Sequence, residues 1–148
     1  MAGKSNSGLR IPPQNIDSEK ALLGSIMLRP ESIEDIIDIV DADSFYIEKH
    51  RIIYRAMVEL IQKMEPIDLL SLSSKLKEKG QLDQIGGNSY LAELVNSVPS
   101  SANIGHYAGI VHKKSILRKL IEAADHVSEL GFSENEELDK VLDEAEKK

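Results

Sequence analysis

The residues of this chain that are capable of chemistry are few, and they form no recognisable reactive set. Gly3-Lys4-Ser5 resembles the end of a phosphate-binding loop, but the leading glycine and the preceding strand are missing. No serine, histidine and carboxylate group together, and the histidines are too dispersed for a helical zinc pair. The four are His50, His106, His112 and His126. We therefore expect no catalytic residue, no metal site and no cofactor in this chain.

One acidic segment resembles the start of a calcium loop. Asp41 and Asp43 have the spacing of the first two ligands. However, Tyr46 stands where the loop needs glycine, and Ile52 stands where it needs a bidentate glutamate. We interpret this segment as a capped turn.

A single compact basic patch is present in the second half of the chain, and its members are Lys113, Lys114, Arg118 and Lys119. Lys114 and Arg118 share a helix face because they are four residues apart. Such a cluster is usually a solvated helix face, and the functional alternative is a contact with an acidic protein or with DNA. The six aromatic residues are not interleaved with arginine and lysine, so we expect them to pack in the core rather than stack on bases.

Composition favours a cytoplasmic protein whose partner is another protein. The 148 residues include no cysteine, which excludes disulfides and thiolate metal sites. No apolar run approaches the roughly 20 residues that a membrane helix needs, and we expect no membrane association. The formal charge of -7 disfavours a domain that grips phosphate groups, so DNA binding should be weak.

Apolar residues recur at helical spacing through the first hundred residues, which predicts a compact all-α head of about five short helices over residues 11–102. Residues 1–10 form a flexible arm. Asn15 or Asp17 caps the first helix, which Pro30 ends. Asp68 caps the fourth, which ends at Gly80, and Asn88 caps the fifth after a reversal at Gly86-Gly87. The apolar faces of the second to fifth helices are Ile33, Ile36, Ile37 and Val40; Ile53, Met57, Leu60, Ile61 and Met64; Leu69, Leu72 and Leu76; and Tyr90, Leu91, Leu94 and Val95.

Residues 103–148 predict a long antiparallel helical hairpin. The first helix runs from Asn103 to Leu130 and carries two adjacent apolar stripes, which is more than one partner helix covers. Ser133 and Glu136 have capping-box spacing at the start of the second helix. Its apolar face is Leu138, Val141, Leu142 and Ala145. The uncovered stripe predicts a homodimer interface at Ile116, Leu120 and Val127.

Four local signatures, in a fixed order, carry a resemblance to a known family. They are Ile11-Pro12-Pro13-Gln14-Asn15-Ile16-Asp17-Ser18-Glu19 with Leu23-Gly24, Asp43-Ser44-Phe45-Tyr46 with His50-Arg51-Ile52-Ile53-Tyr54, Gly80-Gln81-Leu82-Asp83-Gln84-Ile85-Gly86-Gly87 with Tyr90-Leu91, and Pro99-Ser100-Ser101-Ala102-Asn103-Ile104 with Tyr107-Ala108. Together they resemble the N-terminal domain of the bacterial replicative DNA helicase, the DnaB family. We interpret the matched positions as fold determinants rather than catalytic groups. These are Phe45, Tyr46, His50, Arg51, Gly86, Gly87, Pro99, Ser100, Ala102 and Asn103.

The resemblance implies an architectural role in DNA replication. Helicases of this kind continue into a linker helix and an ATPase domain that uses ATP and magnesium, and the chain stops before such a domain. The implied partners are a second copy within a hexamer built as a trimer of dimers, the C-terminal domain of primase, and a helicase loader. The expected primase interface is Ile121, Val127 and Leu142.

Two other functions are compatible with the sequence. The helicase-binding domain of primase resembles this fold, although the four signatures follow the helicase pattern. A small helical enzyme would need a cleft with converging titratable groups, and the sequence offers no such set.

Overall fold

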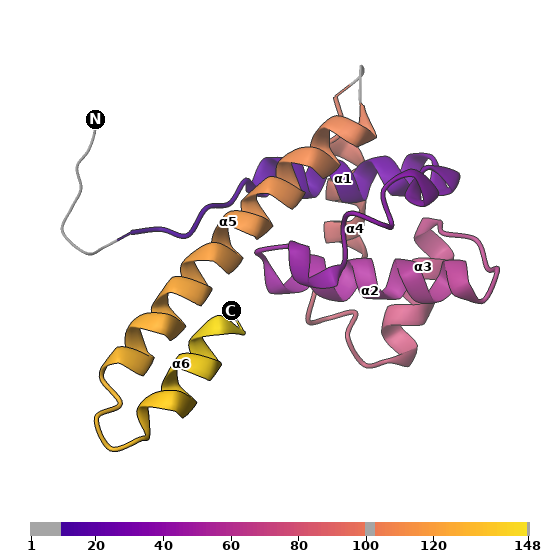
Figure 1. Cartoon of the computed structure of the whole chain (residues 1–148). Helices are drawn as coiled ribbons and strands as arrows, with labels where there is room; N and C mark the ends of the chain where they lie inside the picture. The colour runs from indigo at the N-terminus through magenta and orange to yellow at the C-terminus, as the bar shows by residue number, and fades with distance from the viewer. Residues whose placement is uncertain (1–9, 100–102, 148) are drawn as a thin grey trace. The chain divides into compact units, whose positions relative to one another are not determined.

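The computed structural model describes residues 10–99 and 103–147, and all regular structure within them is helical. This confirms the all-α class. The chain divides into two compact units, Gln14–Ser115 and the described residues of Met1–Pro13 with Ile116–Lys148 (Figure 1). The boundary falls inside one helix rather than at residue 103. Most of the expected arm lies outside the described residues, as do Gly3-Lys4-Ser5, Ser100 and Ala102.

Six α-helices and two short 3-10 helices make up the described chain. They are α1 (Ile16–Leu28), η1 (Pro30–Asp35), η2 (Ala42–Ser44), α2 (Glu48–Gln62), α3 (Leu69–Glu78), α4 (Gly87–Asn96), α5 (Ile104–Gly131) and α6 (Leu138–Glu146).

Helix α1 begins and ends where the sequence predicts. The side chain of Asn15 accepts a hydrogen bond from the backbone N–H of Ser18 at 2.9 Å, so Asn15 and not Asp17 is the cap. The helix ends at Leu28, two residues before Pro30. Nine of its residues are buried, so α1 lies at the centre of the head.

The predicted second α-helix is wrong in type although right in its buried face. Residues 30–35 form the 3-10 helix η1, with Pro30 at its start, and Ile36 donates its backbone N–H to the Ile33 carbonyl. A proline at the first position is compatible with an α-helix as well, so local sequence does not distinguish the two helix types here. Ile33, Ile36 and Val40 are still buried in the core.

Two details of the remaining head helices also correct the sequence reading. Met64 does not extend the buried face of α2, because the helix ends at Gln62 and Met64 is 94% exposed with a φ of 58°. Asn88 does not cap α4, because that helix begins at Gly87 with Gly86 as its left-handed N-cap. The predicted cap Asp68 is confirmed, since its carboxylate accepts the backbone N–H of Ser71 at 2.7 Å.

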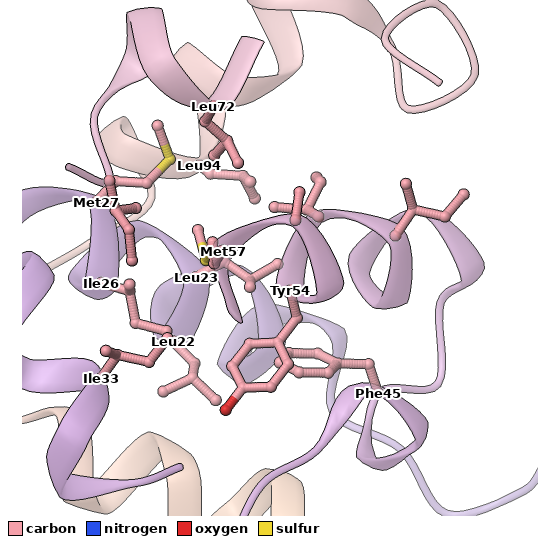
Figure 2. Packing of buried hydrophobic residues seen from close by; sticks show 14 of the residues in the cluster. Leu22, Leu23, Ile26, Met27, Ile33, Phe45, Tyr54, Met57, Leu72 and Leu94 are labelled. Atoms are coloured by element: carbon pink, nitrogen blue, oxygen red, sulfur yellow. The ribbon is translucent and has the colours of Figure 1, made fainter. Parts of the chain in front are cut away.

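The core of the head is made by side chains from α1, α2, α3 and α4 and from the turns between them (Figure 2). Leu22, Leu23 and Ile26 project from α1 toward Met57 and Tyr54 of α2. Phe45 packs against Tyr54, with their ring centroids 5.2 Å apart. The first part of α5 contributes Ala108 and Val111 to the same core.

Helix α5 has 28 residues, which confirms the predicted long helix. Helix α6 has nine residues and no buried side chain. Its N-cap is Glu137, which makes no side-chain cap, so the predicted capping box at Ser133 and Glu136 is wrong. Those two residues instead form a turn through a backbone hydrogen bond from Glu136 to the Ser133 carbonyl.

Candidate protein interface on the helical hairpin

The hairpin formed by the distal part of α5 and by α6 leaves its large apolar side chains in solvent. Leu120 is 66% exposed and Leu138 is 70% exposed. We name the exposed set the hairpin apolar face, and its members are Ile116, Leu120, Ile121, Val127, Leu138 and Leu142. Large apolar side chains gathered in this way are typical of a surface that binds another protein.

Helix α6 covers only one side of α5. Nε2 of His126 lies 3.7 Å from the Glu144 carboxylate, and His126, Ala123 and Leu130 are half-buried on this side. At about 100° per residue, Ile116, Leu120 and Val127 lie within about 40° of one another on α5. The structure therefore brings the three residues of the predicted dimer interface onto one exposed face.

The three residues of the predicted primase interface do not share a face in the same way. Ile121 and Val127 are six residues apart on α5, which places them about 120° apart around the helix. Val127 shares its side of α5 with Leu120, whereas Ile121 is exposed on another side. Leu142 is exposed on α6. A single flat partner surface cannot cover all three residues equally.

The four residues of the basic patch differ in their contacts and exposure. A guanidinium N–H of Arg118 donates to the carbonyl of Pro13 at 2.7 Å and so fixes the Ile11-Pro12-Pro13 segment to α5. Lys113 and Lys119 are exposed, and Lys114 is half-buried. Arg118 therefore has a structural contact, and the lysines supply the exposed positive charge.

The head contains a buried polar network that the sequence did not predict as a unit. Glu19, in α1, accepts hydrogen bonds from the backbone N–H groups of Tyr46 at 2.6 Å and Ile47 at 3.4 Å. Its carboxylate also lies 2.7 Å from Nδ1 of His50, and both side chains are almost fully buried. Because the carboxylate only accepts, Nδ1 must carry the proton. His50 is thus a core histidine held by its partners.

Tyr90 closes the network on the other side of His50. Its hydroxyl lies 2.6 Å from Nε2 of His50, and in the neutral imidazole with its proton on Nδ1 the hydroxyl donates and Nε2 accepts. Burial raises the pKa of Tyr90 to about 12, with smaller contributions from the charges of Glu93 and Glu19. The Tyr90 hydroxyl therefore stays neutral throughout the physiological pH range.

Other signature residues fix the backbone in the same region. The Arg51 Nε–H donates to the Phe45 carbonyl at 2.7 Å. A Cβ added to Gly24 would lie 2.1 Å from the carbonyl oxygen of Leu94, so only glycine lets α1 approach α4 this closely. Among the signature residues, Arg51 and Gly24 therefore make structural contacts, as do Glu19, His50 and Tyr90. Spacing alone shows a pattern of polar residues, but it does not show that Glu19 joins two of the signatures.

The described residues offer no metal centre and no membrane segment. Across residues 10–99 and 103–147, no three histidine, aspartate or glutamate side chains are placed to hold a metal ion. Within the same ranges no helix is long and apolar enough to cross a bilayer.

Comparisons with known proteins agree with this architecture. Residues 11–113 match the family model for the DnaB-like helicase N-terminal domain. The chain is 44% identical over 138 residues to the replicative DNA helicase DnaC of Bacillus subtilis (strain 168), covering 93% of this chain and 30% of that protein. The chain thus spans about a third of the length of this relative.

Solved structures give the same result at the level of the fold. The N-terminal domain of DnaB helicase from Mycobacterium tuberculosis superposes with a TM-score of 0.84 at 34% identity, covering 92% of this chain and 96% of that chain. A DnaB-like replicative helicase solved in a study of its interactions with primase gives a TM-score of 0.72 at 31% identity, covering 88% of this chain and 31% of that one. The chain therefore belongs to the DnaB-like helicase N-terminal domain family.

Proposed function

We propose that this chain is the N-terminal scaffold of a replicative DNA helicase, which pairs subunits and receives primase during DNA replication. The exposed apolar face of the hairpin carries the proposal. Nine residues of α6 cannot form a stable isolated helix, and none of them is buried within the chain. A partner that covers this face supplies the missing burial.

The first partner is a second copy of the chain. Ile116, Leu120 and Val127 form a continuous exposed stripe on one side of α5. Covering such side chains in a homodimer stabilises it by roughly 25 cal/mol for each Å² of apolar surface removed from water. In the complete helicase, three such dimers would form the collar of a hexameric ring.

The second partner is the C-terminal domain of primase. A DnaB-like helicase that is 31% identical to this chain has been studied in its interactions with primase. Since Ile121 lies on a different side of α5 from Val127, primase contacts Ile121 and Leu142 where the dimer leaves them uncovered. A helicase loader is a further partner of the complete protein, and DNA meets the ring mainly through its other domain.

The catalytic activity belongs to the part of the helicase that follows this domain. ATP and magnesium are expected there, at a cytoplasmic replication fork, and no residue of this chain is assigned to them. The buried Glu19, His50 and Tyr90 side chains are sequestered from any substrate, because each is at most 9% exposed. They hold the head together and do not form an enzyme site.

The test is a comparison of two matched leucine substitutions in self-association. Leu120→Asp places an uncompensated charge in the proposed dimer interface and should weaken association by several powers of ten. Leu70→Asp is the control, because Leu70 is 76% exposed on α3, which belongs to the other compact unit of the chain. Sedimentation equilibrium should find the parent and the control dimeric and Leu120→Asp monomeric. Equal association constants for the parent and both variants would show that the stripe is not part of the dimer interface.

Primase binding is tested by titration of the chain with the C-terminal domain of primase and, separately, with single-stranded DNA at physiological salt. Ile121→Ala and Leu142→Ala should each weaken primase binding by about 1 to 3 kcal/mol, as few residues dominate such interfaces. Circular dichroism must show unchanged helical content, since a folding defect would also abolish binding. Tight DNA binding without detectable primase binding would contradict the proposal and direct attention to the basic patch.

A further inference from the structure

A pocket of about 340 Å³ lies on the head, between helix α2 and the chain that follows η1. Its walls are mostly apolar, and the half-buried apolar side chains among them are Ile37, Ala42 and Val58. Sites that hold small ligands measure about 300 to 1,000 Å³, so this pocket has room for one large side chain. All of it lies within the compact unit Gln14–Ser115.

The chain beside this pocket is strongly acidic. Residues 30–43 hold six acidic residues and no basic one, and all six are exposed. Residues 1–119 hold 15 acidic and 15 basic residues, so this segment carries a formal charge of -6 within a part of the chain that is neutral as a whole. We name residues 30–43 the acidic edge, and its acidic residues are Glu31, Glu34, Asp35, Asp38, Asp41 and Asp43.

The acidic edge adjoins the pocket. Asp41 lines it, and Asp38 directly follows the lining residue Ile37. Of the six carboxylates, only that of Asp43 lies within ion-pair distance of a basic side chain in the described ranges, at 3.9 Å from the Arg55 guanidinium. Arg55 also lines the pocket, but a single guanidinium does not balance the surrounding carboxylates. The rim of the pocket is therefore negative.

An apolar pocket with a charged rim is the usual anatomy of a site that anchors a protein partner. Glu59 also lines this pocket, but its carboxylate is paired with Lys79, so the free carboxylates are those of the acidic edge. Their negative charge repels the phosphates of nucleic acids and attracts lysine and arginine side chains. The partner that complements this surface is thus basic as well as apolar.

We propose that this surface docks a basic segment of a partner protein, with one large apolar side chain in the pocket and lysine or arginine side chains against Asp38 and Asp41. The site is separate from the hairpin apolar face, and the inference does not depend on the dimer and primase contacts proposed above. One anchored side chain gives a weak and reversible contact, and the charges set its specificity and its rate of association.

The first test measures the binding of three fluorescein-labelled peptides to the chain by anisotropy at low salt. One peptide is Lys-Lys-Leu-Trp-Lys-Lys, the second replaces each lysine with glutamate, and the third replaces leucine and tryptophan with serine. The first should bind about 10-fold or more tightly than either of the others, because each of those lacks one of the two recognised features. Raising the salt should weaken the first peptide. Equal binding of the first and third peptides would overturn the proposal, as would tighter binding of the second.

Two variants and a control locate the site. Asp38→Asn with Asp41→Asn should weaken the first peptide about 3- to 10-fold, and asparagine caps as well as aspartate at the start of η2. Ile37→Ser removes part of the pocket wall and should weaken it about 5-fold or more, and Ile37 lies outside the core cluster. The matched control removes two other exposed carboxylates of the head, by Glu65→Gln with Asp83→Asn, and should stay within about 2-fold of the parent. A control as weak as the Asp38 and Asp41 variant would overturn the site.

The bound peptide must also be localised, because residues 120–148 hold ten acidic and three basic residues. In two-dimensional amide NMR spectra of the parent chain, the first peptide should shift the signals of residues 37–42 and 54–62. Shifts confined to residues 120–148 would mean that charge alone draws the peptide to the hairpin, and the proposal would be wrong. Saturable binding of calcium ions by Asp38 and Asp41, with no peptide binding, would also overturn it.

Discussion

Glu19 connects α1 to the backbone before α2 and to a histidine within α2. Its carboxylate, buried in α1, accepts hydrogen bonds from two backbone N–H groups at the start of the α2 region and contacts His50. Buried carboxylates persist only when their hydrogen bonds are made, and here the signatures themselves supply the partners. The polar residues of the first and second signatures are therefore joined in space for a structural reason.

Tyr90→Phe tests the direction of the last hydrogen bond in this network. The change leaves Nε2 of His50 without a donor and should cost about 1 to 3 kcal/mol at neutral pH. Because the folded-state pKa of Tyr90 is raised to about 12, the stability from its proton is complete below pH 10 and is lost as the pH rises through 12. Chemical denaturation should therefore find the variant and the parent converging between pH 10 and 12. A difference that stays constant over that range would contradict this account.

Gly24→Ala tests the close approach of α1 and α4. The new Cβ would lie 2.1 Å from the Leu94 carbonyl oxygen, which is backbone and cannot move aside easily. Overpacking should cost about 1 to 3 kcal/mol or more, although alanine is the better helix former. The matched control is Gly109→Ala in α5, where no atom lies within 4 Å and alanine should stabilise by about 1 kcal/mol. The midpoint temperature of thermal unfolding should fall for Gly24→Ala and rise for Gly109→Ala.

At the scale of elements, α2 and α3 end in the same way with different residues. Both helices close with paired backbone hydrogen bonds, from Glu65 to the Leu60 carbonyl in α2 and from Gln81 to the Leu76 carbonyl in α3. The residue after the C-cap is left-handed in both, with a φ of 58° at Met64 and of 70° at Gly80. Glycine adopts this conformation without strain, whereas methionine does not.

Met64→Gly should therefore stabilise the head. The Met64 side chain is 94% exposed and has little packing to lose, so relief of the left-handed strain should raise the free energy of unfolding by about 0.5 to 1 kcal/mol. Gly80→Ala, at the equivalent position of α3, is the opposite control and should destabilise by at least that amount. Urea denaturation compares the two directly. A destabilised Met64→Gly would mean that Met64 makes a contact not present in the isolated chain.

The same two positions explain what the sequence predicts well and what it does not. Gly80 is recognised as a helix end because glycine is the usual left-handed residue, and Asn15 and Asp68 are recognised as caps for similar reasons. Met64 carries no such signal, and its spacing from Leu60 and Ile61 imitates a buried face. The 3-10 geometry of η1 is likewise set by its surroundings, since the buried Ile33 and Ile36 fit either helix type.

The proposed dimer interface is the part of the chain that the sequence predicts least well, because it depends on which side of α5 is covered by α6. The helical periodicity identifies two apolar stripes on α5 but does not show which of them packs against α6. In the structure Ala123 and Leu130 of α5 are half-buried, while Leu120 and Val127 of the same helix stay exposed. Tertiary packing decides which side of α5 is covered, and the local sequence pattern does not predict that packing.

At the scale of the whole molecule, the acidity of the chain is a property of the hairpin end rather than of the head. Residues 1–119 are formally neutral, so the net charge of -7 argues against phosphate binding mainly at residues 120–148. Within residues 10–99 and 103–147 no phosphate-binding loop follows a strand, and we predict that the chain binds no nucleotide. Isothermal titration with Mg-ATP should give no saturable heat, and DNA should not stimulate phosphate release above a buffer blank. Stoichiometric nucleotide binding would contradict the assignment of ATPase chemistry to another domain.

The division of the chain into two units predicts that dimerisation orders one of them and leaves the other unchanged. The head buries its own core, whereas α6 buries no side chain within the chain and is too short to be stable alone. Dilution through the dissociation constant should therefore lower helical content by about the nine residues of α6, measured by far-ultraviolet circular dichroism. Leu120→Asp should show the lower value at every concentration, with the thermal transition of the head retained. Helical content that stays constant while sedimentation shows the dimer dissociating would mean that α6 is stable on α5 without a second copy.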